Sequence, residues 1–413
     1  MVPEGWKFQP LKSLGQKTRP AVKAGPFGSA LKKDVYVSSG YKVYGQEQVI
    51  AGDDSVGDYY IDADKFKSLE SCSVQPGDIL LSLVGTIGKV LLLDEHSQVG
   101  VINPRLLRVS SSPQKIDSLF LKHFFESEKT THTLLSWAQG GTMGVLNAQM
   151  IRELQVPTPP LPEQKKIAEI LSTWDQAITA TERLLENSQQ RKKGLMQQLL
   201  TGKKRLPGFE GEWEEVKVGT VLSVRKDKQI PSEDAPLYSL TIESGITEKT
   251  DRYNREFLVK DAKEKQYKKV LPKDIVYNPA NLRWGAINYS RLSHTVVVSP
   301  IYEVLYVTEP EKHCLEFLAQ SLMRPDQINR FASMVEGTLM ERMAVKIGPF
   351  LATRLRVPPS VAEEQAIATI LSAADSEIIA LNKRLRGLEQ EKKALMQQLL
   401  TGKRRVQVDT EAA

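Results

Sequence analysis

IAEILSTWDQAITATERLLENSQQRKKGLMQQLLTGKKR (residues 167–205) returns 200 residues later as IATILSAADSEIIALNKRLRGLEQEKKALMQQLLTGKRR (residues 367–405). The two stretches align without a gap, 22 of their 39 residues are identical, and residues 195–203 recur unchanged as residues 395–403. An internal repeat of this kind decides how the rest of a chain is divided. The sequence therefore consists of two head segments, each followed by a copy of one element.

Each copy of the repeat predicts a long helix. Neither copy contains Pro, and residues with high helix propensity dominate both. Apolar residues recur at a 4-3 spacing, beginning at Ile167 in the first copy and Ile367 in the second, and this spacing is typical of a coiled-coil seam. Gly202 and Gly402 are predicted to end the helices in the left-handed conformation. Thirty-five helical residues would span roughly 50 Å.

Three polar residues, Thr181, Ser188 and Lys192, interrupt the first seam, so that helix is predicted to be weak alone. Two such rods in one chain favour packing against each other within one molecule. A homo-oligomeric coiled coil is the alternative.

Composition limits the classes of protein that this chain can represent. A chain of 413 residues can form two or three domains with real cores. Its two Cys argue against a disulfide framework and fit a reducing, cytoplasmic environment, and its five His are scattered without metal-ligand spacing. The first ten residues, MVPEGWKFQP, do not resemble a signal peptide, and no apolar run reaches membrane-spanning length. We therefore expect no metal site and no membrane partner.

The net charge of +6 comes mainly from the repeats, because acidic and basic residues nearly balance in the heads. Each copy ends in a basic triplet, residues 203–205 and 403–405. Such residues can either complement the helix dipole or bind phosphate, and the sequence leaves both readings open.

The two heads echo each other faintly. Trp6 is matched by Trp213, and residues 76–79 (PGDI) are matched by residues 272–275 (PKDI). Because the helices match much better than the heads, the rods are interpreted as a common frame and the heads as interchangeable parts. We divide the chain into a first head (1–153), a linker and helix (154–205), a second head (206–354), a linker and helix (355–405) and a tail (406–413).

Both heads are predicted to be α+β. In the first head, residues 78–84 and 90–94 predict a β-hairpin, and residues 116–129 and 146–154 predict helices, the second capped by Asn147. In the second head, residues 274–277 and 294–307 predict strands, while residues 310–323 and 326–335 predict helices. Proline-rich segments, residues 157–162 and 358–359, are predicted to be stiff connectors into the rods.

Several short motifs resemble catalytic ones but are incomplete. Residues 85–89 (GTIGK) lack the spacing of a phosphate loop, and residues 163–165 (EQK) follow a proline rather than lying on a strand. Asn-Pro at 103–104 and 278–279 begins an adenine-methyltransferase motif that neither completes. We therefore predict no catalytic residue, and we interpret the chain as a binding protein.

Two similar heads on a rigid frame fit a linear target that is read at two places, and double-stranded DNA is the natural candidate. Polar, basic and aromatic side chains in the heads could contact phosphates and base edges. The candidates are Lys23, Ser29, Lys32, Lys33, Lys42, Tyr44 and Gln46 in the first head, and Arg225, Lys226, Arg252, Arg255, Asn281, Arg283 and Trp284 in the second.

The chain resembles the specificity (S) subunit of Type I restriction–modification enzymes over nearly its whole length. The resemblance rests on residues 25–29 (GPFGS), 41–46 (YKVYGQ), 85–89 (GTIGK), 159–164 (PPLPEQ) and the LMQQLLTG that ends each helix. The second head departs from this pattern: it lacks the Phe-Gly-Ser turn and has VAEEQ where the first has LPEQ.

This resemblance implies an α+β fold with two target recognition domains, joined by two long helices that pack as an antiparallel coiled coil with pseudo-twofold symmetry. Each head would read one half of a split DNA sequence, and the helices would set the spacer. Two modification subunits would methylate adenine at N6 with S-adenosylmethionine, and restriction subunits would cleave DNA with ATP and Mg. This chain would need no cofactor of its own.

The modification subunits would dock on helix surfaces that lie off the seam. We expect Met196, Gln197 and Gln198, with their counterparts Met396, Gln397 and Gln398, to belong to that docking surface, the alternative being a solvated helix face. Two other functions stay open: a non-catalytic, two-headed protein-binding scaffold and a stand-alone DNA enzyme.

Overall fold

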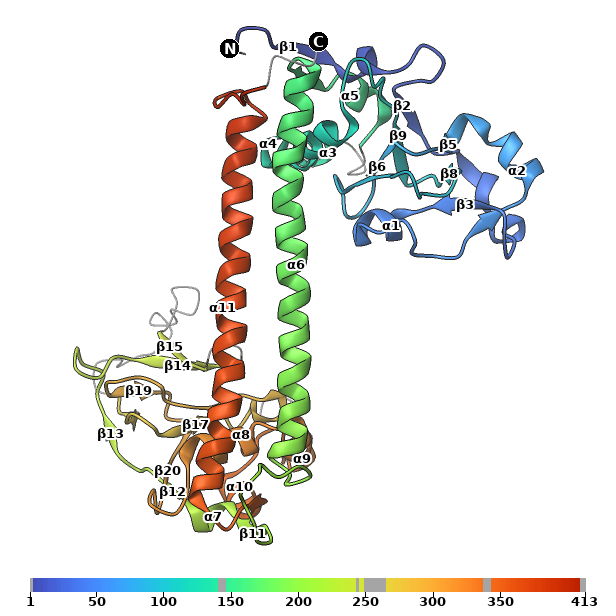
Figure 1. Cartoon of the computed structure of the whole chain (residues 1–413). Coiled ribbons are helices and arrows are strands. Elements are labelled where there is room, and N and C mark those ends of the chain that lie inside the picture. The colour runs from blue at the N-terminus through green and yellow to red at the C-terminus, as the bar shows by residue number, and fades with distance from the viewer. Residues whose placement is uncertain (1–2, 140–145, 243–244, 249–264, 337–342, 409–413) are drawn as a thin grey trace. The chain divides into compact units, whose positions relative to one another are not determined.

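Two helices of 39 residues each, α6 (Leu161–Leu199) and α11 (Val361–Leu399), pack together in the computed structural model (Figure 1). The structure describes residues 3–139, 146–242, 245–248, 265–336 and 343–408. The helices are antiparallel, because Lys392 near the end of α11 pairs with Asp175 in α6. Each helix would extend about 58 Å at 1.5 Å per residue. The predicted intramolecular packing is thus confirmed.

The chain divides into two compact units, and both units contain part of each long helix. Unit 1 comprises residues Met1–Glu182 and Lys383–Ala413, and unit 2 comprises Arg183–Asn382. Each unit therefore holds one head together with about half of α6 and half of α11. The sequence-based boundaries at the helix ends stay a prediction.

The head of unit 1 contains two four-stranded sheets. One has the strand order β2-β9-β6-β7 and the other β4-β3-β8-β5. The predicted hairpin is confirmed, since β6 pairs antiparallel with β7. The strands are β1 (Lys7–Pro10), β2 (Val22–Ala24), β3 (Tyr41–Tyr44), β4 (Tyr60–Ile61), β5 (Ser73–Val74), β6 (Ile79–Ser82), β7 (Val90–Leu92), β8 (Gly100–Ile102), β9 (Leu106–Val109) and β10 (Gln155–Thr158), and the helices are α1 (Gln46–Ala51), α2 (Ala63–Ser68), α3 (Ser118–Glu126), α4 (Glu128–Gln139) and α5 (Ala148–Arg152).

The single helix predicted over residues 116–129 is two helices in the structure, α3 and α4. Ser127 lies between them with extended backbone angles. Its hydroxyl donates to the carbonyl of Phe124, and the amide of Thr130 donates to the Ser127 hydroxyl. Ser127 thus ends one helix and caps the next, which apolar periodicity does not reveal. The Asn147 cap of α5 is confirmed, because its side chain accepts from the amide of Met150.

Unit 2 repeats part of this plan. Its four-stranded sheet has the order β12-β20-β17-β18, which corresponds strand for strand to β2-β9-β6-β7, and further sheets contain β13-β16-β19 and β14-β15. The strand predicted at 274–277 is confirmed, whereas the range 294–307 holds two strands that lie in different sheets, and the helix predicted over 310–323 begins only at Leu315. The strands and helices of unit 2 are β11 (Glu214–Lys217), β12 (Leu222–Val224), β13 (Lys228–Gln229), β14 (Tyr238–Thr241), β15 (Gly245–Glu248), β16 (Tyr267–Val270), β17 (Ile275–Tyr277), β18 (Ile287–Tyr289), β19 (Val296–Val298), β20 (Glu303–Val307), β21 (Arg354–Val357), α7 (Val218–Val221), α8 (Leu315–Leu322), α9 (Pro325–Ser333) and α10 (Ile347–Ala352).

A two-stranded sheet joins each head to a long helix. In unit 1, β10 lies just before α6 and pairs antiparallel with β1. In unit 2, β21 lies just before α11 and pairs antiparallel with β11. Part of the first proline-rich connector, including Pro157, is therefore strand rather than free linker. Pairing to an early strand fixes the point where each long helix begins.

Candidate nucleic-acid interface and its helical frame

A buried ion pair lies at the start of α6 in unit 1. Glu163 is 3% exposed, although it carries a charge, and the Arg405 guanidinium pairs with both of its carboxylate oxygens, at 2.6 and 2.8 Å. The indole N–H of Trp6 donates to the same carboxylate at 3.0 Å. A buried carboxylate needs such partners, since an unpaired buried charge is strongly destabilising. Glu163 therefore has a structural role, which accounts for the Glu of the Glu-Gln-Lys motif.

Unit 2 contains the equivalent ion pair. Arg205 binds both carboxylate oxygens of the fully buried Glu363, at 2.6 and 2.7 Å. Each of these arginines is the last residue of a basic triplet. Both arginines are bound by carboxylates, so the third residue of each triplet stabilises the packing of the long helices. This role is neither the helix-dipole interaction nor the phosphate binding that the sequence suggested. The other triplet residues are exposed at the helix ends.

Both long helices end as predicted. Gly202 and Gly402 have φ of 70° and 71°, in the left-handed region that favours glycine. A Cβ added to Gly402 would lie 2.3 Å from Pro3 Cγ, and one added to Gly202 would lie 3.0 Å from the Trp213 ring. Glycine is thus required at these sites both for its backbone angles and for the close packing of the chain segment that begins each head.

Two of the three polar residues that interrupt the helix seam, Ser188 and Lys192, have partners on the opposite helix, whereas the Thr181 hydroxyl donates to the carbonyl of Ala177 in its own helix. Lys192 of α6 forms an ion pair with Asp375 of α11 in unit 2. The counterparts 200 residues away, Lys392 and Asp175, form the same pair in unit 1. The Ser188 hydroxyl donates to Glu377 at 2.9 Å. Ser188 and Lys192 therefore stabilise one register of the antiparallel pair, because each is satisfied only when its partner lies opposite.

Among the candidates in the first head, Lys32 and Lys33 are exposed, beside the short 3-10 helices that follow β2. Lys23 lies in β2 and is half-buried. Ser29 lies in the 3-10 helix Gly28–Leu31, and its side chain lies outside the described part. Phe27, which the sequence placed in a motif but not among the candidates, is 92% exposed.

Three other candidates in this head are engaged by the fold. Lys42 is 3% exposed, and its ammonium donates to the carbonyl of Ser55 at 3.1 Å. Tyr44 is fully buried, and its hydroxyl donates to the carbonyl of Gln98 at 2.7 Å; burial also raises the pKa of Tyr44. Gln46, half-buried, donates to the carbonyl of Val84. Since Lys42 and Tyr44 face the interior, the structure gives them a packing role.

In the second head, Arg225 is held by a carboxylate. Its guanidinium pairs with both oxygens of the buried Asp274, at 2.6 and 2.9 Å, and lies 4.9 Å from the centre of the Tyr306 ring. The hydrogen bonds to Asp274 raise the pKa of Arg225. The neighbouring Lys226 is exposed. Arg252 and Arg255 lie outside the described residues.

The loop between β17 and β18 brings together Asn281, Arg283 and Trp284. The Arg283 guanidinium lies 4.1 Å from the centre of the Trp284 ring, which is 59% exposed. Asn281 is half-buried and precedes the 3-10 helix that carries Arg283 and Trp284. An exposed aromatic ring under a cation offers both stacking area and positive charge.

The six predicted docking residues do not lie on one kind of surface. Met396 is 8% exposed within the core of unit 1, and Met196 is partly buried against the core of unit 2. The glutamines are exposed, and Gln397 donates to Glu128 at 3.1 Å. The methionines thus pack heads on rods, while the remaining exposed residues are Gln197, Gln198, Gln397 and Gln398.

Apart from residues 163–165, which lie in α6, the incomplete catalytic motifs form turns. Residues 85–89 connect β6 to β7 in the hairpin. The side-chain oxygens of Asn103 and Asn278 each accept a hydrogen bond from the amide two residues on, at 2.9 and 3.1 Å, so both Asn-Pro sequences form the same turn. In addition, none of the described helices combines the length and apolar character needed to cross a membrane.

Residues 3–187 match the family model of the Type I restriction modification DNA specificity domain. The chain is 25% identical over 360 residues to the Type I restriction enzyme MjaVIII specificity subunit of Methanocaldococcus jannaschii, covering 81% of this chain and 80% of that one. Residues 3–187 thus resemble a Type I DNA specificity domain, and the whole chain is similar to specificity subunits of Type I restriction–modification systems.

Further comparisons cover almost the whole of this chain. The putative MjaX specificity subunit of M. jannaschii is 24% identical over 438 residues, covering 98% of this chain and 95% of the relative. The crystal structure of the M. genitalium S subunit gives a TM-score of 0.60 at 16% identity, covering 96% of both chains. A chain from a structural study of type I R-M complex assembly gives 0.55 at 15% identity, covering 97% and 99%. The predicted α+β fold with two packed helices is confirmed.

Proposed function

We propose that each head of this specificity subunit binds one half of a bipartite DNA sequence, and that α6 and α11 fix the number of base pairs between the halves. The observation that carries this proposal is the repetition within the frame. Both units contain the same sheet order, the same Arg–Glu pair at a helix start and the same Lys–Asp pair across the helices. Because the two units hold their heads in the same way, each head can bind DNA in an equivalent manner.

The exposed candidates are assigned the DNA contacts. Lys32, Lys33 and Lys226 would bind phosphates, and the Arg283–Trp284 pair would contact base edges or an unstacked base. The buried or paired candidates, Lys42, Tyr44 and Arg225, would shape the heads instead. The half-buried Lys23, Gln46 and Asn281 remain candidates, as do Ser29, Arg252 and Arg255.

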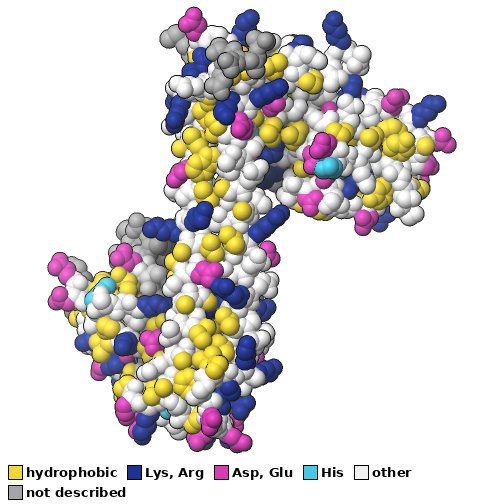
Figure 2. All heavy atoms as spheres, viewed as in Figure 1, with side chains coloured by type: hydrophobic (Ala, Val, Ile, Leu, Met, Phe, Trp, Pro, Cys, Tyr) yellow, Lys and Arg dark blue, Asp and Glu magenta, His cyan; other side chains and the backbone are white. Residues whose placement is uncertain are grey.

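The long helices would also dock two modification subunits that methylate adenine at N6. On the face drawn in Figure 2, Lys and Arg side chains are spread along the rods with exposed hydrophobic side chains between them. Leu184 in α6 and Ile379 in α11 are hydrophobic, yet they are 53% and 67% exposed. Restriction subunits would complete the complex in the cytoplasm, and the partners would hold S-adenosylmethionine, ATP and Mg.

Reconstitution of the methyltransferase tests the function. Purified chain is mixed with modification subunits encoded beside it, and the adenine methylation of plasmid DNA is mapped. Methylation confined to a split sequence supports the proposal. Complex formation without methylation would instead support the protein-binding scaffold, and methylation by the isolated chain would indicate a stand-alone enzyme.

Exchange of one head tests independent reading. Residues 1–153 are replaced by the first head of a relative with a different target, and methylated sites are mapped. We expect one half-site to change while the other half-site and the spacer stay the same. A change in both half-sites would refute independent reading. The reciprocal exchange of residues 206–354 is the matched control.

A heptad inserted into both helices tests the role of the rods. Seven residues are added after Glu182 and seven after Asn382, so that the seam stays in phase. Seven residues add about 10 Å, or about 3 base pairs, so the spacer should lengthen while both half-sites persist. An unchanged spacer contradicts the proposal. Insertion into only one helix, which breaks the pairing, should abolish methylation.

A further inference from the structure

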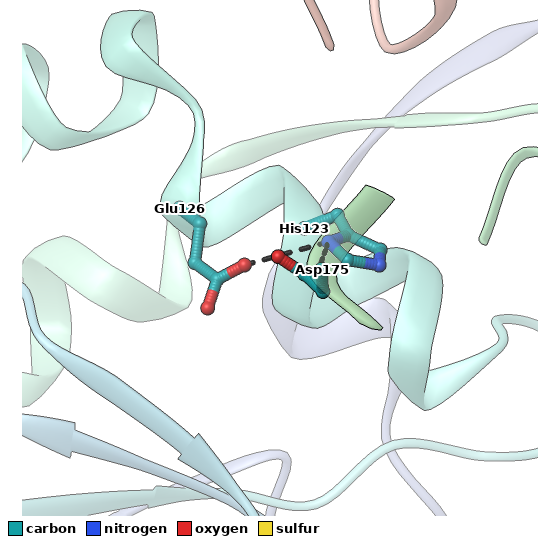
Figure 3. A group of neighbouring side chains, drawn as sticks. All are labelled: His123, Glu126 and Asp175. Atoms are coloured by element: carbon teal, nitrogen blue, oxygen red, sulfur yellow. Dashed lines mark ion pairs between the residues drawn. The ribbon is translucent and has the colours of Figure 1, made fainter. Parts of the chain in front are cut away.

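Three side chains that could ligate a metal converge between α3 and α6 in unit 1. His123 Nδ1 lies 3.4 Å from Glu126 Oε2 and 3.8 Å from Asp175 Oδ2 (Figure 3). The three atoms all lie within 4.8 Å of one another. His123 and Glu126 are one helical turn apart on α3, and Asp175 comes from α6. The cluster therefore combines one nitrogen and two oxygen donors from two separate helices.

Two of the three atoms that face each other lack hydrogen-bond partners within the described residues. His123 is fully buried, yet its Nδ1 has none, and neither has the buried Oε2 of Glu126. The other ring nitrogen of His123, Nε2, lies 3.2 Å from the Ser172 hydroxyl. If Nε2 donates that proton, the lone pair of Nδ1 faces two carboxylate oxygens. Such an arrangement is repulsive unless a proton on Nδ1 or a metal cation lies between the three atoms.

The remaining carboxylate oxygens are already paired. Lys122 Nζ lies 3.0 Å from Glu126 Oε1, and Lys392 forms an ion pair with Asp175 Oδ1. Lys122 is more distant, at 3.9 Å, from Asp175 Oδ2. Outer partners of this kind orient metal-ligating carboxylates and leave the inner oxygens free.

We propose that His123 Nδ1, Glu126 Oε2 and Asp175 Oδ2 bind one divalent transition-metal ion of the zinc class, which ties α3 to α6. Ligands about 2.0–2.2 Å from a tetrahedral zinc lie roughly 3.3–3.6 Å apart, so the observed separations require only small side-chain adjustments. The imidazole ligand selects zinc-class ions over magnesium or calcium. Water would fill the fourth position. The ion would stabilise the contact between the first head and its rod.

Unit 2 provides an internal comparison. The amide of Asp117, which caps α3, donates to Gln164 at 2.8 Å, and the amide of Cys314, which caps α8, donates to Glu364 at the matching position of α11. Asp117 and Cys314 are therefore equivalent positions. His123 lies six residues after Asp117, and Gln320 lies six after Cys314, so Gln320 is the counterpart of His123. In the same way Met323 is the counterpart of Glu126, and Asp375 is the counterpart of Asp175. Unit 2 thus lacks two of the three ligands, and the ion would stabilise one unit only.

Metal binding to the purified full chain, produced without a histidine tag, tests the proposal. After chelator dialysis, the chain is titrated with Co²⁺, followed by visible absorption, and with Zn²⁺, followed by thermal unfolding. We expect one equivalent to bind and the unit 1 transition to rise by roughly 5 °C at saturating Zn²⁺. Absence of both effects in the folded chain overturns the proposal.

Variants locate the ion. Glu126→Gln and His123→Gln should each lose the Co²⁺ spectrum and the Zn²⁺-dependent shift. The second variant introduces the residue type that unit 2 already buries at this position, so it should fold. Asp375→Asn, at the position that matches Asp175, should bind metal as the unaltered chain does. An unchanged spectrum in Glu126→Gln would place the ion elsewhere and overturn the assignment.

Discussion

Arg405 and Glu163, 242 residues apart in sequence, form a two-pronged ion pair with oxygen–nitrogen distances of 2.6 and 2.8 Å. Glu163 begins one long helix, and Arg405 follows the end of the other. Because the carboxylate is buried and the guanidinium is partly exposed, the pair joins the end of α11 to the start of α6 with one partner still hydrated. The pair therefore fixes how the helices align in unit 1.

Loss of this carboxylate charge should destabilise unit 1. Glu163→Gln leaves Arg405 without its counterion and weakens two charge-assisted hydrogen bonds, so we expect the free energy of unfolding to fall by about 2 kcal/mol. Urea unfolding followed by tryptophan fluorescence measures the change. The control is Glu169→Gln, which removes an exposed pair with Lys166 and should cost less than about 0.5 kcal/mol. Equal effects would show that burial of Glu163 is unimportant.

The polar pair across the seam should be energetically coupled. Lys192 and Asp375 are only partly exposed, so a double-mutant cycle with alanine should give a coupling energy of about 1 kcal/mol. The same cycle on Arg354 and Glu215, which are more than half exposed, should give a value near zero. Urea unfolding of the four variants in each cycle supplies the numbers. Coupling in the exposed pair alone would contradict this account.

Replacement by alanine should have opposite effects on stability at Gly387, within α11, and at Gly402, just after its end. Gly387 lies within the helix, and a Cβ there meets no atom within 4 Å, so Gly387→Ala should stabilise the chain by about 1 kcal/mol. Gly402→Ala combines a positive φ with a clash against Pro3, so it should destabilise by about 2 kcal/mol or more. Thermal unfolding compares the two variants. No loss of stability in Gly402→Ala would refute the helix-end assignment, and destabilisation by Gly387→Ala would contradict the open space around that residue.

Thiol chemistry should report the burial of Cys314. Burial raises the pKa of this thiol to about 11. At pH 8 its thiolate fraction is therefore about 100-fold below that of a thiol with a pKa of 9, and alkylation should be correspondingly slow. The rate should keep increasing with pH above 9, because deprotonation is far from complete there. Iodoacetamide labelling with mass spectrometry measures it in a Cys72→Ala variant, and the urea-unfolded chain is the control.

Salt dependence should reveal phosphate contacts. If Lys32 and Lys33 bind phosphates, each change to alanine should reduce by about 1 the magnitude of the negative slope of log K against the logarithm of the salt concentration. The loss should be similar on specific and non-specific DNA, because phosphate carries no sequence. Fluorescence anisotropy with the assembled methyltransferase measures both slopes. Lys166→Ala, on the rod, is the control and should leave the slope unchanged.

The repeat was enough to predict the frame, because helix periodicity and glycine stops are local signals. Both helices, their ends at Gly202 and Gly402 and the hairpin of β6 and β7 followed from residue patterns alone. The ion pair of Glu163 and Arg405 did not, since nothing local distinguishes a buried carboxylate from a solvated one.

The heads were harder to interpret residue by residue. Lys42 and Tyr44 look like surface contacts in sequence, yet β3 is an inner strand of its sheet, between β4 and β8, and both side chains face the interior. Phe27, which lies in the Gly-Pro-Phe-Gly-Ser motif, is 92% exposed. Exposure of a side chain depends on which strands become neighbours, and pairing between distant strands is not encoded in local composition.

The division of the chain bears on the order in which a nascent polypeptide acquires structure. Unit 2 is one continuous segment, Arg183–Asn382, whereas unit 1 needs Lys383–Ala413 as well as the first 182 residues. Synthesis runs from the N-terminus, so the ribosome releases every residue of unit 2 before the last ones of unit 1. The half that is begun first is thus finished last, and its buried Glu163 has no counterion until residue 405 has left the exit tunnel.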